Sequence, residues 1–433
     1  MSVAGRLSEL VGPLVGGELP VRIVGWDGSQ AGPADAPTLK VNSRRALRRL
    51  LWEPNELGLA QAYITGELDV PGGAGELSDG LRRVWHHARA TDAGPVRLSA
   101  RQKARAAGLA LRLGALGRRL PAPSSQAKVS GALHSRARDR AVIAHHYDLS
   151  NEFYSLILDE SMAYSSGYYP DATTTLAQAQ RAKLDLICRK LALEPGMRLL
   201  DVGCGWGSLS LHAAEHYGVR VLGVTISQQQ HEFITKRIAE RNLADRVEVR
   251  VQDYRAVSEP AFDAVSSIEM GEHVGLDNYP TYAATLFGHL KPTGRLLLQQ
   301  MSRRADAAPG GGPFIEAYIA PDMHMRPLSG TLGFLEQAGF EVREVQSLRE
   351  HYVRTVADWL TEFEANYPQA VAMVGEEIAR VWRLYLVGGG LSFAEGRMGV
   401  DQILAVRPSE LGVSAMPPAP DWYSLSTHDP VVE

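Results

Sequence analysis

A buried strand, a glycine-rich turn and a helix follow one another directly near the middle of the chain. The apolar strand begins at Leu199 and ends at Val202, glycines occupy positions 203, 205 and 207, and a helix is expected from Ser208 to Tyr217. Glycines with positive φ let the backbone approach a ligand, and a helix N-terminus attracts a carboxylate. Strands and helices continue to alternate beyond this point, which predicts a doubly wound α/β sheet.

The same alternation predicts where the strands of this sheet lie. We expect strands at Arg198–Gly203, Val219–Thr225, Val247–Asp253, Phe262–Ile268 and Gly294–Met301, and a final antiparallel hairpin at Phe340–Ser347 and Asp401–Arg407. The stretch between the two hairpin strands is too long for a simple connection and has helical periodicity from Val353 to Phe393. We therefore predict a helical insertion at 353–393 that forms a lid or a wall of a substrate cavity.

Residues at the strand ends indicate the class of ligand. A dinucleotide site needs an acidic residue after the second strand to bind the ribose. This chain has Gly223 to Gln230 there, without an acid, whereas Asp253 and Tyr254 follow the third strand and can hold an adenine amino group. The pattern predicts S-adenosylmethionine as the cofactor, with Asp201, Gly203 and Gly205 at its site, and argues against a nicotinamide cofactor.

Composition limits the remaining possibilities. The net charge is -4 and the pI is about 6.4, which argues against a general nucleic-acid binder. The two cysteines, Cys188 and Cys204, exclude a disulfide framework and lack metal-ligand spacing, so we expect no bound metal and a reducing compartment. The first twenty residues lack the features of a secretory signal, and no apolar run is long enough to span a bilayer. We expect a cytoplasmic protein that is soluble or peripherally associated with the inner face of the plasma membrane.

Three regions are predicted along the chain. Residues 1–94 mix short strands and helices and indicate a small α+β domain, and residues 139–433 form the catalytic domain. Between them, residues 95–138 contain ten Lys or Arg and no Asp or Glu, with a helix pattern from Ser99 to Leu120 and a linker at Pro121 to Ser125. A solvated helix, a membrane-surface helix and a nucleic-acid contact all fit this composition. We favour contact with an anionic membrane.

Further motifs carry a family resemblance. They are His145 to Tyr154 (HHYDLSNEFY), Met162 to Tyr168 (MAYSSGY) and Glu272 to Gly275 (EHVG). With the glycine turn, they make the chain resemble the cyclopropane-fatty-acyl-phospholipid synthase family, which includes the mycolic acid methyltransferases, over about residues 130 to 410. The phrases Val24 to Ser29 and Glu56 to Tyr63 resemble the actinobacterial, phospholipid-acting branch.

The resemblance implies a class I methyltransferase fold with a helical acyl-binding cap, and transfer of a methyl group to a cis double bond of an acyl chain. Tyr164, Ser165, Thr225 and Gln230 match family positions that touch the cofactor. In cyclopropane synthases a bound bicarbonate, held by a Cys, a Glu, a His and a Tyr, acts as the base. These four positions correspond here to Ser166, Glu272, Gln299 and Tyr352. His146 joins this catalytic set, although it can equally be a core or capping histidine.

Two of the four positions depart from the family pattern. Ser166 replaces a thiol, and Gln299 replaces a ring that can carry a charge. Either bicarbonate is held differently or a protein carboxylate replaces it. The candidates are Glu272, Glu269, Asp139 and Glu152, and Glu269 can equally serve only to bind the ribose or a backbone amide.

The altered set fits the branch that converts an oleoyl phospholipid into a 10-methylene-stearoyl phospholipid, the precursor of tuberculostearic acid. A cyclopropane synthase is the alternative. The expected partners are an oleoyl phospholipid, an anionic membrane surface and a flavin- or NADPH-dependent reductase acting on the product, and the sequence is compatible with a homo-oligomer. A nicotinamide oxidoreductase, a noncatalytic lipid-binding protein and a small-molecule methyltransferase are the rival interpretations.

Overall fold

The computed structural model describes residues 2–12, 19–90, 100–127, 131, 138 and 149–423. The chain divides into two compact units. Unit 1 comprises Met1–Lys128, Gly312–Pro321 and Trp359–Leu391, and unit 2 comprises Val129–Gly311, Asp322–Asp358 and Ser392–Glu433. This division differs from the predicted domain boundaries, because most of the helical insertion groups with the N-terminal residues.

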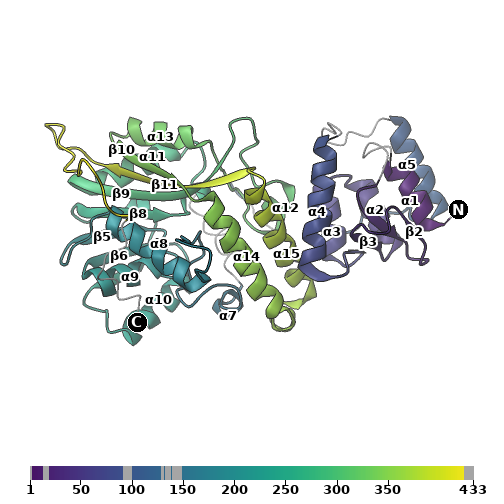
Figure 1. Ribbon diagram of the computed structural model, residues 1–433, viewed down its shortest axis with the longest axis horizontal. Helices are drawn as coiled ribbons and strands as arrows, with labels where there is room; N and C mark the ends of the chain where they lie inside the picture. The colour runs from purple at the N-terminus through teal and green to yellow at the C-terminus, as the bar shows by residue number, and fades with distance from the viewer. Residues whose placement is uncertain are drawn as a thin grey trace. The chain divides into compact units, whose positions relative to one another are not determined.

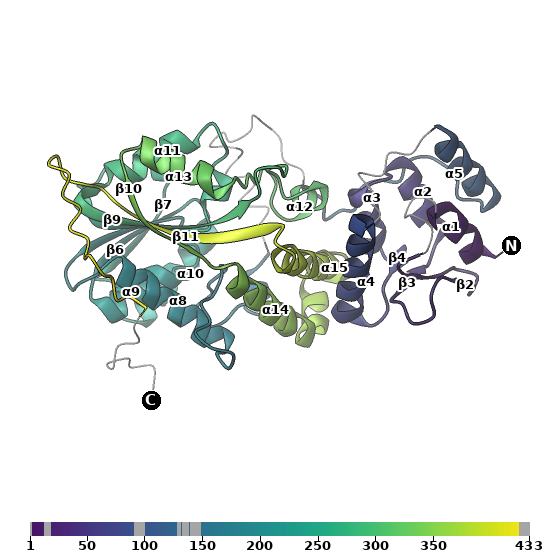
Figure 2. The ribbon, with the colours of Figure 1, turned by 45° about the horizontal axis from the view of Figure 1, so that its top comes forward.

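A seven-stranded mixed sheet forms the centre of unit 2. Its order is β10-β11-β9-β8-β5-β6-β7, and Figure 2 shows β11 as a yellow strand. The strands are β5 (Arg198–Val202), β6 (Arg220–Thr225), β7 (Val247–Val251), β8 (Phe262–Ile268), β9 (Leu290–Arg303), β10 (Glu341–Ser347) and β11 (Met398–Val406). β5 lies parallel to both β6 and β8, and β11 pairs antiparallel with β9 and β10. The predicted doubly wound sheet with its antiparallel last hairpin is confirmed.

Helices cover both faces of this sheet. On one face lie α8 (Leu176–Lys190), α9 (Ser208–Tyr217) and α10 (Gln228–Glu240), and on the other lie α11 (Tyr279–Gly288) and α13 (Leu328–Gln337) (Figure 1). Neighbouring residues of a strand point to opposite faces, so Leu199 joins one core cluster and Leu200 the other. Unit 2 also contains three short helices, α7 (Asn151–Tyr154), η2 (Tyr254–Ala256) and η3 (Gly271–His273).

Unit 1 contains the predicted short strands and helices of the N-terminal region. Its small sheet has the order β2-β1-β3-β4, from β1 (Arg22–Val24), β2 (Gln30–Ala31), β3 (Thr38–Val41) and β4 (Leu68–Asp69). Its helices include α1 (Val3–Val11), α2 (Arg44–Trp52), α3 (Glu56–Ile64), α4 (Gly73–Ala90), α5 (Ala100–Arg112) and α12 (Pro313–Tyr318). The insertion forms α14 (Arg349–Ala365) and α15 (Tyr367–Ala394). Val387 and Leu391 of α15 share a buried cluster with Tyr63, Ala74 and Leu77.

The helix predicted for the basic segment is shorter than expected. α5 ends at Arg112 instead of continuing to Leu120, and Gly114 follows it with a left-handed φ of 64°. Pro121 to Ser125 is not helical, and it is held by a hydrogen bond from Arg49 to the Pro121 carbonyl (3.1 Å) and one from the Ser125 N–H to Glu377 (2.8 Å). Among the described helices, none is long and apolar enough to cross a membrane.

Candidate active site

Four chain segments meet where the parallel strands of unit 2 end. The strand order places β5 between β6 and β8, so chain connections leave in opposite directions at this point, which is where open α/β sheets bind ligands. Gly203 follows β5, Ser227 follows β6, Asp253 follows β7 and Glu269 follows β8. Most of the predicted site residues lie on these segments, on Tyr164–Ser166, or on β9 next to them. Tyr352 lies on α14, and His146 and Asp139 lie outside the described residues.

The glycine turn after β5 has room beside its backbone. Gly203 has a φ of 75°, and a Cβ there would lie 2.7 Å from the Met270 side chain. Gly205 has a φ of 55°, and no heavy atom lies within 4 Å of the position that its Cβ would take. Both positions therefore favour glycine, the first because of a close neighbour and the second because of its backbone conformation. The open space at Gly205 and the N-terminus of α9 beyond it fit the carboxylate end of a cofactor.

Asp201 links the two elements that flank this turn. Its side chain is buried, and its oxygens accept hydrogen bonds from Ser210 of α9 (2.7 Å) and Ser266 of β8 (3.0 Å). Burial raises the pKa of this carboxyl. The two serines lie on the elements that flank the turn, so we expect Asp201 to act on the cofactor through the position of the turn.

Side-chain contacts fix the backbone at the ends of β6 and β7. Thr225 donates to the Gln230 side chain (2.7 Å), and Ser227 caps the N-terminus of α10 by accepting from the Gln230 N–H. Asp253 accepts from the Arg255 guanidinium (2.6 Å), and Tyr254 packs edge-on against Tyr282. These contacts fix the predicted cofactor residues at the sheet edge.

An aromatic cluster beside the glycine turn was not predicted. The Trp206 ring lies 4.7 Å from Tyr154 and 6.5 Å from Tyr164, measured between ring centroids, and its N–H donates to Asn151 (2.8 Å). The predicted residue Tyr164 thus belongs to an aromatic wall. Trp206 stands inside the glycine motif and Tyr154 inside the first family motif, so their positions in those motifs were the available signal.

Behind Ser165 lies a buried lysine. The Lys183 ammonium is 1% exposed and donates to the Ser165 hydroxyl (2.8 Å). Burial lowers its pKa to about 8, and the nearby carboxylates of Glu269, Asp159 and Asp201 oppose that shift. The Lys183 amine and the Glu269 carboxylate are therefore close enough to interact electrostatically.

Glu269 is the residue on which three predicted catalytic positions converge. One of its oxygens accepts from the Ser166 N–H (2.9 Å) and the Gln299 amide (2.7 Å), and the other accepts from the Tyr352 hydroxyl (2.7 Å). Ser166 takes part through its backbone, because its hydroxyl donates to the Gly167 carbonyl (3.0 Å). A protein carboxylate therefore lies among the positions that the resemblance assigned to bicarbonate.

Gln299 is itself oriented by a buried row of polar side chains. Its carbonyl oxygen accepts from Gln402 of β11 (3.0 Å), whose own oxygen accepts from Lys190 (3.0 Å). Lys190 forms an ion pair with Glu344 of β10 (2.8 Å). Because every amide in the row has one possible orientation, the Gln299 NH₂ group points toward Glu269.

Glu272 lies one turn farther along, and its surroundings differ. It is 1% exposed; one oxygen accepts from the Met301 N–H, and the other has no hydrogen-bond partner among the described residues. Burial and the neighbouring carboxylate of Glu269 raise the pKa of Glu272 to about 8. Burial also raises the pKa of Glu269, although its three donors favour the ionised form. Glu272 therefore holds its proton at neutral pH, and Glu269 has more of the donors that stabilise a carboxylate.

α14 fixes the segment that contains Ser166. The Thr355 hydroxyl accepts from the Gly167 N–H (3.0 Å), His351 accepts from the Tyr169 N–H (3.0 Å), and Asp358 accepts from the Tyr169 hydroxyl (2.7 Å). These α14 residues and Tyr352 recur at helical spacing, so one helix face supports both the segment and Glu269. Glu152, another candidate base, is exposed to solvent.

Comparisons with known proteins agree with this geometry. A family model described as mycolic acid cyclopropane synthetase matches residues 134–403. A probable fatty acid methyltransferase of Mycobacterium tuberculosis (strain ATCC 25618 / H37Rv) is 37% identical, covering 94% of this chain and 95% of that protein. The tuberculostearic acid methyltransferase UfaA1 of the same organism is 30% identical, covering 90% of this chain and 88% of that protein.

A solved relative carries a cofactor product. The mycolic acid cyclopropane synthase CmaA1, complexed with SAH and CTAB, is 33% identical with a TM-score of 0.59, covering 62% of this chain and 98% of that one. The class I methyltransferase fold and the S-adenosylmethionine cofactor predicted from the sequence are thus confirmed. The chain belongs to the mycolic acid cyclopropane synthetase family and is an S-adenosylmethionine-dependent fatty acid methyltransferase.

Proposed function

We propose that the protein methylates the cis double bond of an oleoyl chain on a phospholipid and produces a 10-methylene-stearoyl phospholipid. The observation that carries this proposal is the position of Glu269. Its carboxylate accepts hydrogen bonds from Ser166, Gln299 and Tyr352, the positions at which the family binds its bicarbonate base. A base covalently attached to the protein occupies a fixed position, and that position determines which proton it removes.

The residues at the sheet edge would hold the cofactor, which supplies an electrophilic methyl group. Addition of this methyl to C10 of the alkene leaves a cation at C9. A hydride shift from C10 to C9 moves the cation to C10, and loss of a proton from the new methyl group then forms the exocyclic double bond. Glu269 accepts that proton and becomes neutral. The Tyr352 hydroxyl and the Gln299 amide keep Glu269 ionised and aligned until then.

Glu272 has a different role in this proposal. Its protonated side chain adds no second negative charge to the site, so the developing cation faces one carboxylate in a buried environment. Closely spaced carboxylates with unequal numbers of hydrogen bonds generally divide acid and base roles in this way.

Cyclopropane formation is the second candidate. The family description and the retained Glu272 favour it. The two outcomes differ in one step, because direct loss of a methyl proton from the C9 cation closes a three-membered ring without a hydride shift.

Labelled oleate distinguishes the two products. A bacterial host without its own cyclopropane synthase would express the chain while it is fed oleate deuterated at C9 and C10, and its fatty acids would be analysed by mass spectrometry. We expect a C19 product with an exocyclic methylene and both deuterium atoms on C9. A ring with one deuterium on each carbon would establish the cyclopropane synthase instead, and absence of a C19 product would reject both.

The product implies two further partners. An exocyclic methylene can be saturated only by hydride and proton addition, so we propose that a flavin- or NADPH-dependent reductase consumes it. Because the acyl chain of a phospholipid lies within a bilayer, we also propose that the enzyme works at an anionic membrane surface, on the inner face of the plasma membrane.

A further inference from the structure

Two basic helices that are far apart in the sequence pack together in unit 1. α2 and α5 contact each other, and neither contains an acidic residue. α2 has four arginines, and α5 has Arg101, Lys103, Arg105 and Arg112. Only α5 belongs to the basic segment predicted from the sequence, and the fold places α2, with its exposed Arg44, beside it.

The chain after α5 is held against α2 by backbone contacts. Arg48 donates to the carbonyls of Ala115 and Leu116 (3.1 Å each), and the Trp52 indole donates to the Gly117 carbonyl (3.0 Å). Glu53 forms an ion pair with Arg119 of this segment (2.7 Å). Arg49, by contrast, is buried in an ion pair with Glu67 and does not contribute to the surface.

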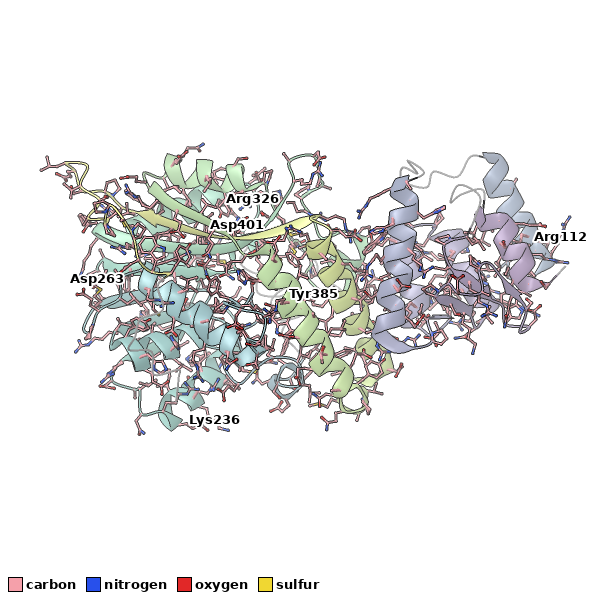
Figure 3. The ribbon with its side chains drawn as sticks, viewed as in Figure 1. Arg112, Lys236, Asp263, Arg326, Tyr385 and Asp401 are labelled. Carbon is pink, nitrogen blue, oxygen red and sulfur yellow. The ribbon has the colours of Figure 1, made fainter. Side chains whose placement is uncertain are left out.

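Three large apolar side chains are exposed on the same segments as these arginines. Leu111 is 66% exposed, Trp52 is 55% exposed and Leu116 is 44% exposed. Isolated exposed apolar residues are common on protein surfaces, but these three lie on the connected α2, α5 and 113–117 segment. Arg44, Arg112 and Arg118 are exposed beside them, without an ion pair to any carboxylate among the described residues; Figure 3 shows Arg112 projecting from α5.

We propose that this docking face, formed by α2, the C-terminal half of α5 and residues 113–119, binds the surface of an anionic phospholipid bilayer. Arginines at the headgroup level would neutralise the lipid phosphates, and the leucines and Trp52 would enter the boundary between headgroups and acyl chains. Exposed leucines have no role in reading a phosphate backbone, so the combination favours a bilayer over a nucleic acid. The inference rests on the proposed function, because it names the surface on which that enzyme meets its substrate.

Vesicle binding by charge variants tests the proposal. The probes are vesicles of dioleoylphosphatidylglycerol mixed with dioleoylphosphatidylcholine, and vesicles of dioleoylphosphatidylcholine alone. Arg44→Glu/Arg112→Glu/Arg118→Glu should bind the anionic vesicles at least about a hundredfold more weakly, since each basic residue near such a surface contributes about fivefold. The matched control reverses three exposed basic residues of unit 2, Arg220→Glu/Lys236→Glu/Arg304→Glu, and should bind as the wild type does.

An apolar variant separates lipid insertion from simple charge attraction. Leu111→Ser/Leu116→Ser should weaken binding to both vesicle types about tenfold without altering the salt dependence. Circular dichroism and thermal unfolding confirm that each variant is folded, and turnover of oleoyl phospholipid dispersed in detergent should be unchanged in all of them.

Three results would overturn the docking face. They are equal losses in the unit 2 control, full vesicle binding by the charge variant, and salt-sensitive binding of RNA or DNA without vesicle binding. A wild type that binds anionic vesicles through these residues but modifies no oleoyl lipid, in vesicles or in detergent, would refute the proposed function and leave the docking face standing.

Discussion

Glu269 and Glu272 lie three residues apart after β8, and they differ in their hydrogen-bond donors. Among the described residues, three donors bind the Glu269 carboxylate and one binds the Glu272 carboxylate. In the proposed function, Glu269 accepts the substrate proton and Glu272 keeps its own.

Replacing each carboxylate with an amide tests this assignment. Glu269→Gln should lower kcat about 10²–10⁴-fold, because the amide cannot accept the proton that leaves the substrate. Glu272→Gln should lower kcat much less, since a Gln side chain resembles a protonated carboxyl in shape and charge. Single-turnover kinetics measures both, with cofactor affinity by calorimetry as the control. Equal losses in the two variants would contradict the division of roles.

The raised pKa of Glu272 also links stability to pH. The folded protein holds a proton on Glu272 up to pH about 8, whereas the unfolded chain releases it near 4.5. Stability from this group is therefore complete below pH 4.5 and declines as the pH rises toward 8, by up to about 5 kcal/mol. Urea unfolding between pH 5 and 8.5 should show this decline in the wild type and a shallower slope in Glu272→Gln. Parallel slopes would mean that Glu272 is ionised in the folded state.

At the scale of residues, the sequence motifs predicted which residues lie at the site better than they predicted the contact that each residue makes. Ser166, Gln299 and Tyr352 were predicted, and they do lie together. Glu269 was one of four candidate bases, because its place among those residues depends on contacts between segments far apart in the chain. The part played by the Ser166 backbone could not be foreseen, since every residue except proline has the same N–H.

At the scale of elements, the N-terminal part of α14 contacts the segment that contains Ser166. Its buried Thr355 accepts from the Gly167 N–H next to Ser166. Thr355→Val keeps the shape of the side chain but leaves that buried N–H without its partner, which should destabilise the protein by about 1–3 kcal/mol and raise KM for the cofactor. Thr281→Val, at an exposed position on α11, should change stability by less than about 0.5 kcal/mol. Chemical denaturation compares the two; equal effects would mean that the buried bond is unimportant.

The elements that the sequence predicted well are those with strong periodicity. Each strand of the large sheet lies within a few residues of its expected range, because buried strands are apolar and end at turn residues. The end of α5 was misplaced by eight residues, at Arg112 instead of Leu120. Its Ala- and Leu-rich pattern continues past Gly114, but Arg48 and Trp52 of α2 bind the carbonyls that a longer helix would have used.

At the scale of the whole molecule, unit 1 is assembled from three separate stretches of the chain. Removing residues 1–128 would take away Tyr63, Ala74 and Leu77, which cover Val387 and Leu391 of α15. We expect the remaining chain to aggregate or to bind a hydrophobic dye strongly, because that apolar surface would face water. Size-exclusion chromatography and dye fluorescence, with the full chain in parallel, measure this. A monomeric fragment with an unchanged Tm would show that α15 does not depend on the N-terminal residues.

The discontinuity of unit 1 was beyond sequence reasoning, which placed the boundary by composition. Nothing in the local pattern of 359–391 reveals that these helices pack with residues near the N-terminus, because both regions are ordinary amphipathic helices. Fold class and cofactor were predictable from short motifs, whereas the assembly of the units depended on packing between distant segments.

The same discontinuity sets the order of events during synthesis. At about 5–20 residues per second, the ribosome needs roughly 13–50 s to extend the chain from Lys128 to Leu391. Throughout that interval Tyr63 and Leu77 of the newly made N-terminal region lack their contacts with α15, because that helix has not been translated. Nascent-chain chaperones therefore have a long window in which to engage this region, and slow codons between the two stretches would prolong its exposure to proteases.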